Sequence, residues 1–531
     1  MSGAPLRGEH WWDGRGHAGV GEGYAAIEAA SGAELAPRYR DASAAEVEAA
    51  VAAAAGAAAP FAAAGPELRA RFLRAIAARL LGLGDELLDR AGRETALPRA
   101  RLEGERARTV LQLEQFADRA QEGSWVDARI DRGDPHRTPQ PRPDLRAMLV
   151  PLGPVAVFGA SNFPFAYSVA GGDTASALAV GCPVVVKAHP AHPGTSELTA
   201  RAIAAAAAEC ELPAGVFGMV HGRSHEVGAA LVQHPDVAAV GFTGSVAGGS
   251  ALCRLAAARD VPIPVFAEMG SVNPVFVLPG ALRARGDRIA AMLSASALLA
   301  TGQFCTSPGM ALVPDDPAAE SFLERLGQAI ASAAPGTLVH PSIREHFERA
   351  LGAVRAIDGV VQRAAAAGAP ACAATGAGAV LLQATVDTVL EHGRLRDEVY
   401  GPALLAVRCR DVDDMLRVAR ALHGHLTATV HATNDDLAEH RELLQVLRGK
   451  VGRLVFDGVP TGVEVATAMQ HGGPWPASSD SRFTAVGPRA MLRWARPVCW
   501  QDAPAVHLPP ELADDNPRDL WRTVDGALGR H

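Results

Sequence analysis

Apolar residues recur at helical spacing between residues 40 and 122. The segments DASAAEVEAAVAAAAGAA, PELRARFLRAIAARLLGLGDELLDRAGRET and PRARLEGERARTVLQLEQFADRA carry apolar positions three or four residues apart, with polar residues between them. This period is typical of amphipathic helices. The charged, proline-rich segment 131–144 then breaks the pattern, as expected of a linker or an exposed hairpin tip.

From residue 155 the pattern changes to short apolar runs that alternate with helical stretches. The runs occupy 155–159, 183–188, 216–222, 237–242 and 263–268, and helices are expected at about 170–180, 195–210, 224–233 and 245–259. This alternation predicts βαβ units on a parallel sheet, with ligands at the carboxyl ends of the strands. A second α/β stretch contains NPVFVL, a helix across 286–300 and GRLVFDG, whereas the tail after 502 is predicted to be irregular.

Composition narrows the class of protein. A chain of 531 residues is too long for one hydrophobic core, so two or more domains are expected. The net charge of -8 and the absence of any Lys/Arg run argue against nucleic-acid and membrane partners. Neither the N-terminus nor the alanine-rich segment 46–65 has the sequence pattern of a signal peptide or a membrane span. Seven scattered cysteines without a CxxC motif fit a reducing compartment, and we expect a cytoplasmic enzyme.

Two glycine-rich stretches are candidates for a phosphate loop. GRGHAG, at 14–19, matches G-x-G-x-x-G, but EHWWD before it does not resemble a buried strand and no helix follows, so we predict a surface turn. VGFTGSVAGG, at 240–249, follows a predicted strand and opens a helix. There Gly244 and Gly249 would let the backbone approach a pyrophosphate and Ser245 would add a donor. The alternative is an ordinary turn in which glycine serves packing.

Four further motifs occur in order along the chain: GASNFPF, VVVKAHP, FAEMGSVNPVF and GQFCT. Together they resemble the aldehyde dehydrogenase superfamily. GGDTASALAVGCPVVVKAHPAHPGTSEL, EMGSVNPVF and HGGPWPASSDSR look like its 2,5-dioxovalerate (α-ketoglutarate semialdehyde) dehydrogenase subgroup.

The resemblance implies an α/β fold with two doubly wound parallel-sheet domains and a small oligomerisation hairpin. It places a cofactor-binding domain at 1–125 and 148–266, a catalytic domain at 267–480, the oligomerisation element at 126–147 and 481–501, and a C-terminal tail at 502–531. An exchanged hairpin of this kind implies a homodimer or homotetramer.

The resemblance also implies three catalytic residues. Cys305 matches the nucleophile, whose thiolate attacks the aldehyde carbon. Asn162 matches the amide that donates to the resulting oxyanion, together with the Cys305 backbone N–H. Glu268 matches the general base that activates water to hydrolyse the thioester.

The resemblance also implies which residues bind the cofactor. Lys187, one of only two lysines in the chain, matches the lysine that contacts the adenosine ribose. NAD-preferring relatives commonly carry a glutamate three residues later, where this chain has Pro190. A 2′-phosphate would meet no like charge there, and Arg223 is a second phosphate partner, so we predict NADP preferred with NAD possible. Glu398 and Tyr400 match the contacts to the nicotinamide ribose and ring.

The subgroup resemblance implies a small-molecule aldehyde substrate, 2,5-dioxopentanoate, which is oxidised to 2-oxoglutarate. Arg482 is the candidate for binding its carboxylate, and Phe165 and Phe304 would line an apolar throat. Such a throat equally suits long aliphatic aldehydes, so a broad or fatty-aldehyde dehydrogenase is an alternative.

Three further classes of protein could carry some of these residues. An acylating dehydrogenase would lack the base that Glu268 supplies, and a catalytically silent member of the fold would not need Cys305. A thiol hydrolase would need a histidine base beside the cysteine, which no motif nominates. His189 and His192 lie among prolines without further ligands, so we expect a loop there and no metal site.

Overall fold

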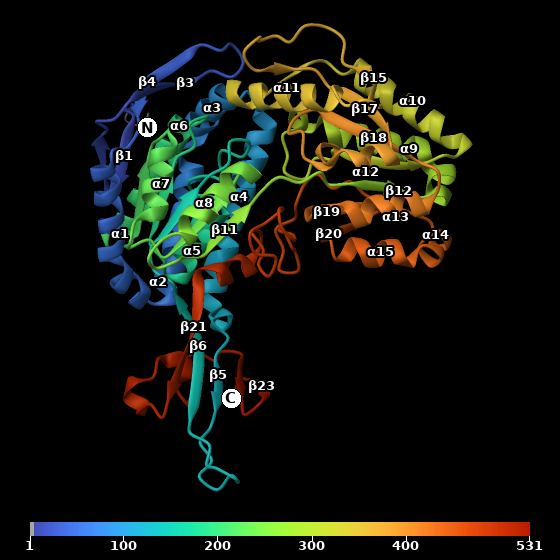
Figure 1. Cartoon of the computed structure of the whole chain (residues 1–531). Helices are drawn as coiled ribbons and strands as arrows, with labels where there is room; N and C mark the ends of the chain where they lie inside the picture. Colours follow the sequence, from blue (N-terminus) through green and yellow to red (C-terminus); the bar gives the residue numbers. More distant parts are fainter. Residues whose placement is uncertain (1–4, 531) are drawn as a thin grey trace.

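Two seven-stranded sheets organise the chain, which we describe from a computed structural model of residues 5–530 (Figure 1). The ends of the sequence-based domain ranges, 1–4 and 531, lie outside the described residues. The α/β class expected from the alternating pattern is confirmed.

The first sheet has the order β11-β10-β7-β8-β9-β1-β2. Its parallel strands are β7 (Val155–Phe158), β8 (Val184–Lys187), β9 (Phe217–Val220), β10 (Ala239–Thr243) and β11 (Val265–Glu268). Helices α5 (Gly172–Val180), α6 (Pro193–Glu209), α7 (His225–Gln233) and α8 (Val246–Ala257) lie between them in the chain. Strand order reverses beside β7, so the loops after β7, β8 and β10 adjoin one another at the carboxyl edge, where ligands bind in such sheets.

The strand before GRGHAG was missed from the sequence. β1 (Glu9–Trp12) and β2 (Arg15–Ala18) form an antiparallel hairpin that joins the first sheet through Trp11 and Met219. His10 and Trp12 are buried, although two tryptophans beside charged residues do not resemble a core strand. Only Gly14 of GRGHAG lies in the hairpin turn, because Arg15–Ala18 form β2, so the predicted surface turn was mostly wrong. The element that follows β2 is another strand, so the motif does not have the setting of a phosphate loop.

The segment with the helical pattern is helical, as predicted, and the second of its three stretches divides into two helices. The helices are α1 (Ala44–Ala63), α2 (Pro66–Gly82), α3 (Gly84–Thr95) and α4 (Arg99–Glu122). The first begins with a capping box in which Ser43 N–H donates to Glu46 Oε2 at 2.7 Å and Glu46 N–H donates to Ser43 Oγ at 3.3 Å. Within the part of the chain that the structure describes, α1 is the one helix long and apolar enough to cross a membrane. Its apolar residues Val47, Val51 and Phe61 are buried in the protein core.

The second sheet has the order β15-β17-β18-β13-β12-β19-β20. Its strands are β12 (Val275–Val277), β13 (Met310–Pro314), β15 (Val361–Ala365), β17 (Val380–Thr385), β18 (Ala403–Cys409), β19 (His425–His431) and β20 (Val451–Phe456), and only β15 pairs antiparallel among these strands. The helices of this half are α9 (Pro279–Leu298), α10 (Pro317–Ser332), α11 (Pro341–Arg355), α12 (Val386–Glu391), α13 (Val412–Ala421), α14 (Asn434–Glu439) and α15 (Arg441–Arg448). Separate apolar cores form around Phe276 and around Phe322, so the sheet is buried from both sides.

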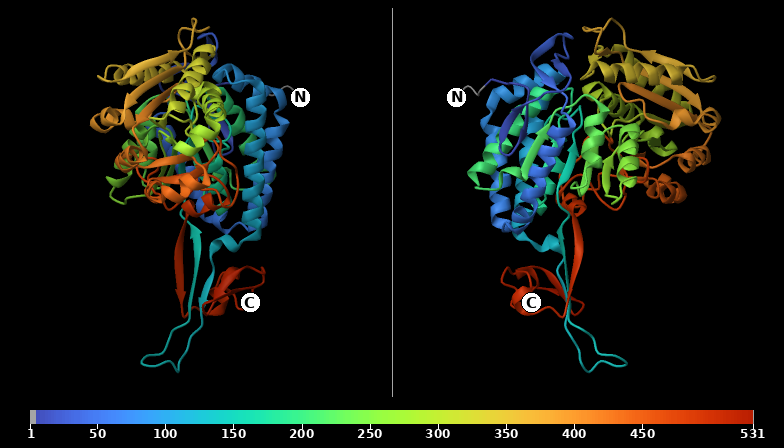
Figure 2. Two further views of the ribbon diagram at one scale, coloured as in Figure 1. Left: turned by 90° about the vertical axis from the view of Figure 1, so that its right-hand side faces the viewer. Right: turned by 60° about the vertical axis from the view of Figure 1, so that its left-hand side comes forward.

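A five-stranded sheet projects from the body of the molecule (Figures 1 and 2). Its order is β21 (Ala495–Gln501), β6 (Leu145–Pro151), β5 (Arg129–Asp131), β22 (Arg522–Val524) and β23 (Ala527–Gly529). The expectation of an irregular tail after 502 was therefore wrong for β22 and β23, whereas 503–521 contain no strand or α-helix. Proline and aspartate are frequent there because they occupy turns, and buried Arg146 anchors the segment by donating to Leu512 O at 2.7 Å.

Two small antiparallel pairs complete the strands. β3 (Gly23–Ile27) pairs with β4 (Glu34–Arg40), and β14 (Gly336–Thr337) pairs with β16 (Gly376–Ala377).

Candidate active site

Cys305 lies in the turn between α9 and β13, and its sulfur is partly buried. The Sγ atom is 3.6 Å from Nε2 of His471, within hydrogen-bond range for sulfur. Burial, followed by the charges of Glu268 and Glu398, raises the pKa of the thiol to about 12. The resting sulfur is therefore a thiol, and a nearby base must take its proton before it can attack an electrophile.

His471 was missed from the sequence. It is buried in the segment after β20, where its backbone N–H donates to Thr484 Oγ1 at 2.9 Å. Burial, followed by the positive charges of Arg453 and Arg108, lowers the pKa of the imidazole to about 3. An imidazole with so low a pKa cannot deprotonate the resting thiol, but it can accept the proton while the sulfur bonds to carbon, because bond formation makes the S–H group far more acidic. No local pattern signals this contact, because 166 residues separate the two side chains.

Glu268 is the last residue of β11, opposite Thr243 of β10. Its side chain is buried, and its Oε2 has no hydrogen-bond partner within residues 5–530. Burial raises the pKa of this carboxyl well above its ordinary value, although Arg493 opposes the shift. The charge of Glu268 acts on the Cys305 thiol, and a carboxyl with a raised pKa is a stronger base than an ordinary one, which suits a general base.

Two asparagines hold residues 303–309, the loop that carries Cys305 and is called the cysteine loop below. The Asn162 amide, in the loop after β7, donates to Gln303 O at 2.9 Å. Asn273, which the sequence did not nominate, donates to Cys305 O at 2.8 Å and to Ser307 O at 2.9 Å. The loop is thereby fixed from the side of each large sheet, and the structure brings Cys305, Glu268 and Asn162 to one site.

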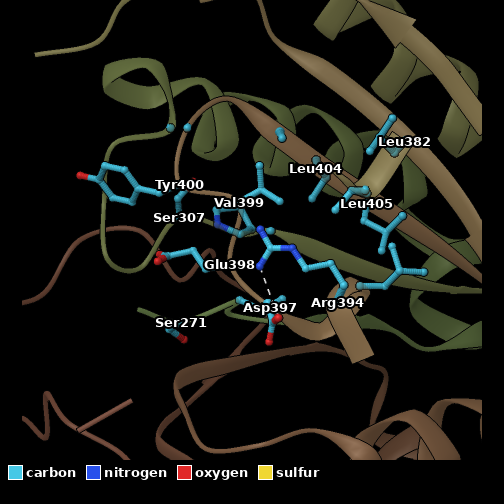
Figure 3. Close-up of a pocket in the computed structure, with 18 of the residues that line it drawn as sticks. Ser271, Ser307, Leu382, Arg394, Asp397, Glu398, Val399, Tyr400, Leu404 and Leu405 are labelled. Atoms are coloured by element: carbon cyan, nitrogen blue, oxygen red, sulfur yellow. Dashed lines mark hydrogen bonds and ion pairs between the residues drawn. The ribbon is translucent and has the colours of Figure 1, made fainter. Parts of the chain in front are cut away.

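Glu398 and Tyr400 line a cavity on the side of the cysteine loop that faces β18 (Figure 3). Burial raises the pKa of Glu398 to about 7, and the Ser271 backbone N–H donates to it. A Cβ on Gly270 would lie 2.4 Å from Glu398 Oε2, so only glycine admits the carboxylate there. Burial, followed by the Glu398 and Cys305 charges, raises the pKa of Tyr400 well above its ordinary value. The cavity reaches the cysteine loop at Phe304 and Ser307, on either side of Cys305, and the charge of Glu398 acts on the Cys305 thiol.

Lys187 ends β8 and donates from Nζ to Gly222 O at 2.5 Å. Burial lowers the pKa of this ammonium to about 8, with Asp41 opposing the shift, and no ion pair to it exists within residues 5–530. Arg223 is the next residue after Gly222, and its exposed guanidinium pairs with Glu22 at 3.1 Å. A buried cation without a carboxylate in contact fits an anionic or hydroxyl-rich ligand at this edge of the sheet.

The glycines at the start of α8 are accounted for by contacts within the protein. Gly244 N–H donates to Glu268 O at 3.0 Å, and a Cβ on Gly249 would lie 2.5 Å from Met269 Sδ. Ser245 caps α8 by accepting from Gly248 N–H at 3.1 Å. These contacts favour a packing role for the glycines, and a cofactor role for the three residues stays a prediction.

The substrate-side residues lie differently from what the sequence suggested. Phe304 packs at 5.3 Å against Phe163, whereas Phe165 belongs to the helical core beside α4. Arg482 is largely exposed and pairs with Asp480. The guanidinium groups that act electrostatically on the Cys305–His471 pair are those of Arg108 and Arg453, neither of which the sequence nominated.

Comparison with known proteins identifies one family over most of the chain. Residues 18–473 match the aldehyde dehydrogenase family. The chain is 51% identical to the alpha-ketoglutaric semialdehyde dehydrogenase 2 of Azospirillum brasilense over 86% of its own length and 87% of that protein. It is 45% identical to the alpha-ketoglutaric semialdehyde dehydrogenase of Acinetobacter baylyi over 87% of each chain. Its fold matches the lactaldehyde dehydrogenase of Escherichia coli with a TM-score of 0.80, at 22% identity over 94% of this chain and 100% of that one.

Proposed function

The chain belongs to the aldehyde dehydrogenase family, and we propose that it oxidises 2,5-dioxopentanoate to 2-oxoglutarate with NADP as the preferred cofactor. It is an NAD(P)-dependent aldehyde dehydrogenase. The names of the two relatives support the substrate. One observation carries the residue assignment: the Cys305 sulfur touches His471 in a site that also contains the buried Glu268 carboxyl and the Asn162 amide.

The first chemical step is proposed to be attack of the Cys305 sulfur on the aldehyde carbon. His471 Nε2 is the base in contact with the thiol and takes its proton as the C–S bond forms. The negative charge that develops on the aldehyde oxygen is stabilised by the Asn162 amide and the Cys305 backbone N–H. In other enzymes a single preorganised donor of this kind contributes about 3 kcal/mol.

Lys187 and Arg223 would hold the adenosine end of the cofactor, and Glu398 and Tyr400 its nicotinamide end. When bound, the nicotinamide supplies the hydride acceptor that makes the reaction an oxidation. Glu268 then takes a proton from the water that attacks the acyl group on Cys305, which releases the carboxylate and returns the thiol. The free Oε2 of Glu268 is available for that water.

The preference for NADP rests on charge. Pro190 provides no carboxylate to accept from the ribose hydroxyls or to repel a 2′-phosphate, and the Lys187 ammonium has no carboxylate in contact. Arg223 adds a second cation on the next loop, joined to Lys187 through the Gly222 carbonyl. A 2′-phosphate could pair with Lys187, and with Arg223 where it displaces Glu22, whereas Pro190 offers a ribose hydroxyl no acceptor.

The assembly is proposed to be a homodimer or homotetramer in the cytoplasm. β21 is an edge strand of the projecting sheet, and an exposed edge can pair with another chain. All seven cysteines are free, which fits a reducing compartment.

A panel of aldehydes tests the proposal. With 2,5-dioxopentanoate as substrate, the wild-type enzyme is expected to have a higher kcat/KM with NADP than with NAD. With NADP as cofactor, its kcat/KM should be higher for 2,5-dioxopentanoate than for hexanal or decanal. Cys305→Ser should abolish turnover. Highest activity with decanal would favour a fatty-aldehyde dehydrogenase, and turnover only with added coenzyme A would favour an acylating one.

A further inference from the structure

Two arginines approach the nucleophile from opposite halves of the molecule. Arg108 lies on α4 in the N-terminal half, and Arg453 lies on β20 at the edge of the second sheet (Figure 1). Both act electrostatically on His471, whose Nε2 is 3.6 Å from the Cys305 sulfur. None of the chemical steps proposed for Cys305, His471 and Glu268 uses either of them.

Arg108 is placed by an aromatic ring. Its Nη2 donates to the Tyr167 hydroxyl at 3.0 Å, and its Cζ lies 5.4 Å from the centre of the same ring. Tyr167 in turn lies beside His471, with ring centres 6.3 Å apart. The Arg108 Nε is buried and has no hydrogen-bond partner within residues 5–530, so this guanidinium keeps unused donor capacity next to the site.

Arg453 is placed by backbone carbonyls. Its guanidinium donates to Gly462 O at 3.0 Å and to Pro460 O at 2.5 Å. These neutral acceptors orient the group without cancelling its charge. Thr461, which lies between these two acceptors, donates from Oγ1 to Thr306 O at 3.3 Å, so the segment that holds Arg453 contacts the residue after Cys305. Burial lowers the pKa of Arg453, and the charges of Cys305 and Tyr167 oppose this shift.

Neither arginine has a carboxylate partner among residues 5–530. In the part of the chain that the structure describes, several buried or half-buried arginines are paired, as Arg101 is with Glu105 and Arg493 with Asp173. No ion pair within the same residues involves Arg108 or Arg453. Two partly buried cations that share a site without an anion are costly unless a ligand supplies the negative charge.

We infer that Arg108 and Arg453 form a clamp that binds the distal carboxylate of the substrate and so selects aldehydes that carry an acid group. This inference rests on the proposed function, because the aldehyde end of the same molecule must reach Cys305. A guanidinium pairs with a carboxylate through two parallel hydrogen bonds, which fixes orientation as well as charge. The carboxylate is thus bound by Arg108 and Arg453 and not by Arg482, the candidate from the sequence.

The test compares acidic and neutral aldehydes of equal length. Arg108→Met and Arg453→Met are assayed with 2,5-dioxopentanoate against pentanal, and with 4-oxobutanoate against butanal. Each substitution is expected to lower kcat/KM for the acidic aldehyde by about 10- to 100-fold relative to the neutral one, mainly through a higher KM. The Lys variants at each position should recover part of the loss because the charge returns.

Arg119→Met is the matched control, since Arg119 is an exposed arginine on the same helix that pairs with Glu122. Calorimetric binding of glutarate gives a second readout that needs no turnover, and both Met variants should weaken it by a similar factor. Equal loss for acidic and neutral aldehydes, unchanged glutarate binding, or a selectivity loss in Arg482→Met alone would overturn the clamp. Failure of the wild type to oxidise acidic aldehydes would instead contradict the proposed function.

Discussion

The protonation state of one sulfur decides how this site works. The pKa of the Cys305 thiol lies at about 12 and that of the His471 imidazole at about 3, because burial disfavours the charged form of each. The resting pair is therefore neutral, unlike a thiolate–imidazolium pair. We therefore propose that the sulfur attacks the aldehyde while its proton moves to the imidazole.

The variant His471→Gln tests whether the imidazole is the base that takes the thiol proton. We expect kcat for aldehyde oxidation to fall about 100-fold, in the usual range for loss of a general base, with little change in Tm. His507→Gln, an exposed histidine in the C-terminal segment, is the control. A kcat in His471→Gln equal to that of the control would exclude the imidazole as the base.

The alkylation of Cys305 by iodoacetamide in the wild type should quicken steadily from pH 6 to pH 10, because a raised thiol pKa leaves the thiolate fraction increasing throughout this range. A plateau below pH 8 would indicate a preformed thiolate and contradict the neutral pair.

Sequence motifs nominated Cys305, Glu268 and Asn162, but they did not nominate His471, Arg108 or Arg453. The first three stand in short motifs next to glycine or at strand ends. The others act through contacts between distant segments, and an isolated histidine or arginine in a sequence rich in arginine carries no local signal.

At the scale of elements, the cysteine loop is held by a close backbone approach. Gly302 has a φ of +69°, and a Cβ there would lie 2.2 Å from Gly401 O. Gly302 precedes Cys305 by three residues, and Gly401 follows Tyr400. The turn that carries the nucleophile therefore packs backbone against backbone on the segment assigned to the nicotinamide.

Gly302→Ala should disturb both segments. The left-handed φ and the close carbonyl together are expected to lower the free energy of unfolding by about 1–3 kcal/mol and to reduce kcat more than tenfold. Urea unfolding and NADP reduction measure the two effects. Gly352→Ala, in helix α11 with open space around the new Cβ, should leave activity unchanged and slightly increase stability. Equal behaviour of the two variants would contradict this account of the loop.

Elements in a repeating pattern could be predicted from the sequence, whereas isolated short strands could not. The helices between 44 and 122 are long enough to show their period, and the strands from β7 to β11, although only four or five residues long, alternate regularly with helices. β1, β22 and β23 have three or four residues each, and their pairing depends on partners far along the chain. This is why Glu9–Trp12 was not recognised as a strand and the tail was taken for irregular chain.

At the scale of the whole molecule, the site exists only where the two large sheets meet. Glu268 ends a strand of the first sheet, Cys305 precedes a strand of the second, and His471 comes from the segment after the last strand of the second sheet. The order of strands and helices was predictable, but the meeting of their loops was not, because it depends on how the sheets pack. The family resemblance predicted that Cys305, Glu268 and Asn162 lie together, but it did not place His471 beside them.

The central claim, that Cys305 carries the acyl group and Glu268 directs water to it, is tested most directly by mass spectrometry of quenched turnover. With 2,5-dioxopentanoate and NADP, Glu268→Gln is expected to complete the first oxidation and then accumulate an acyl adduct on the peptide that contains Cys305, while the wild type shows little. No adduct in this variant, or an adduct on another residue, would contradict the account.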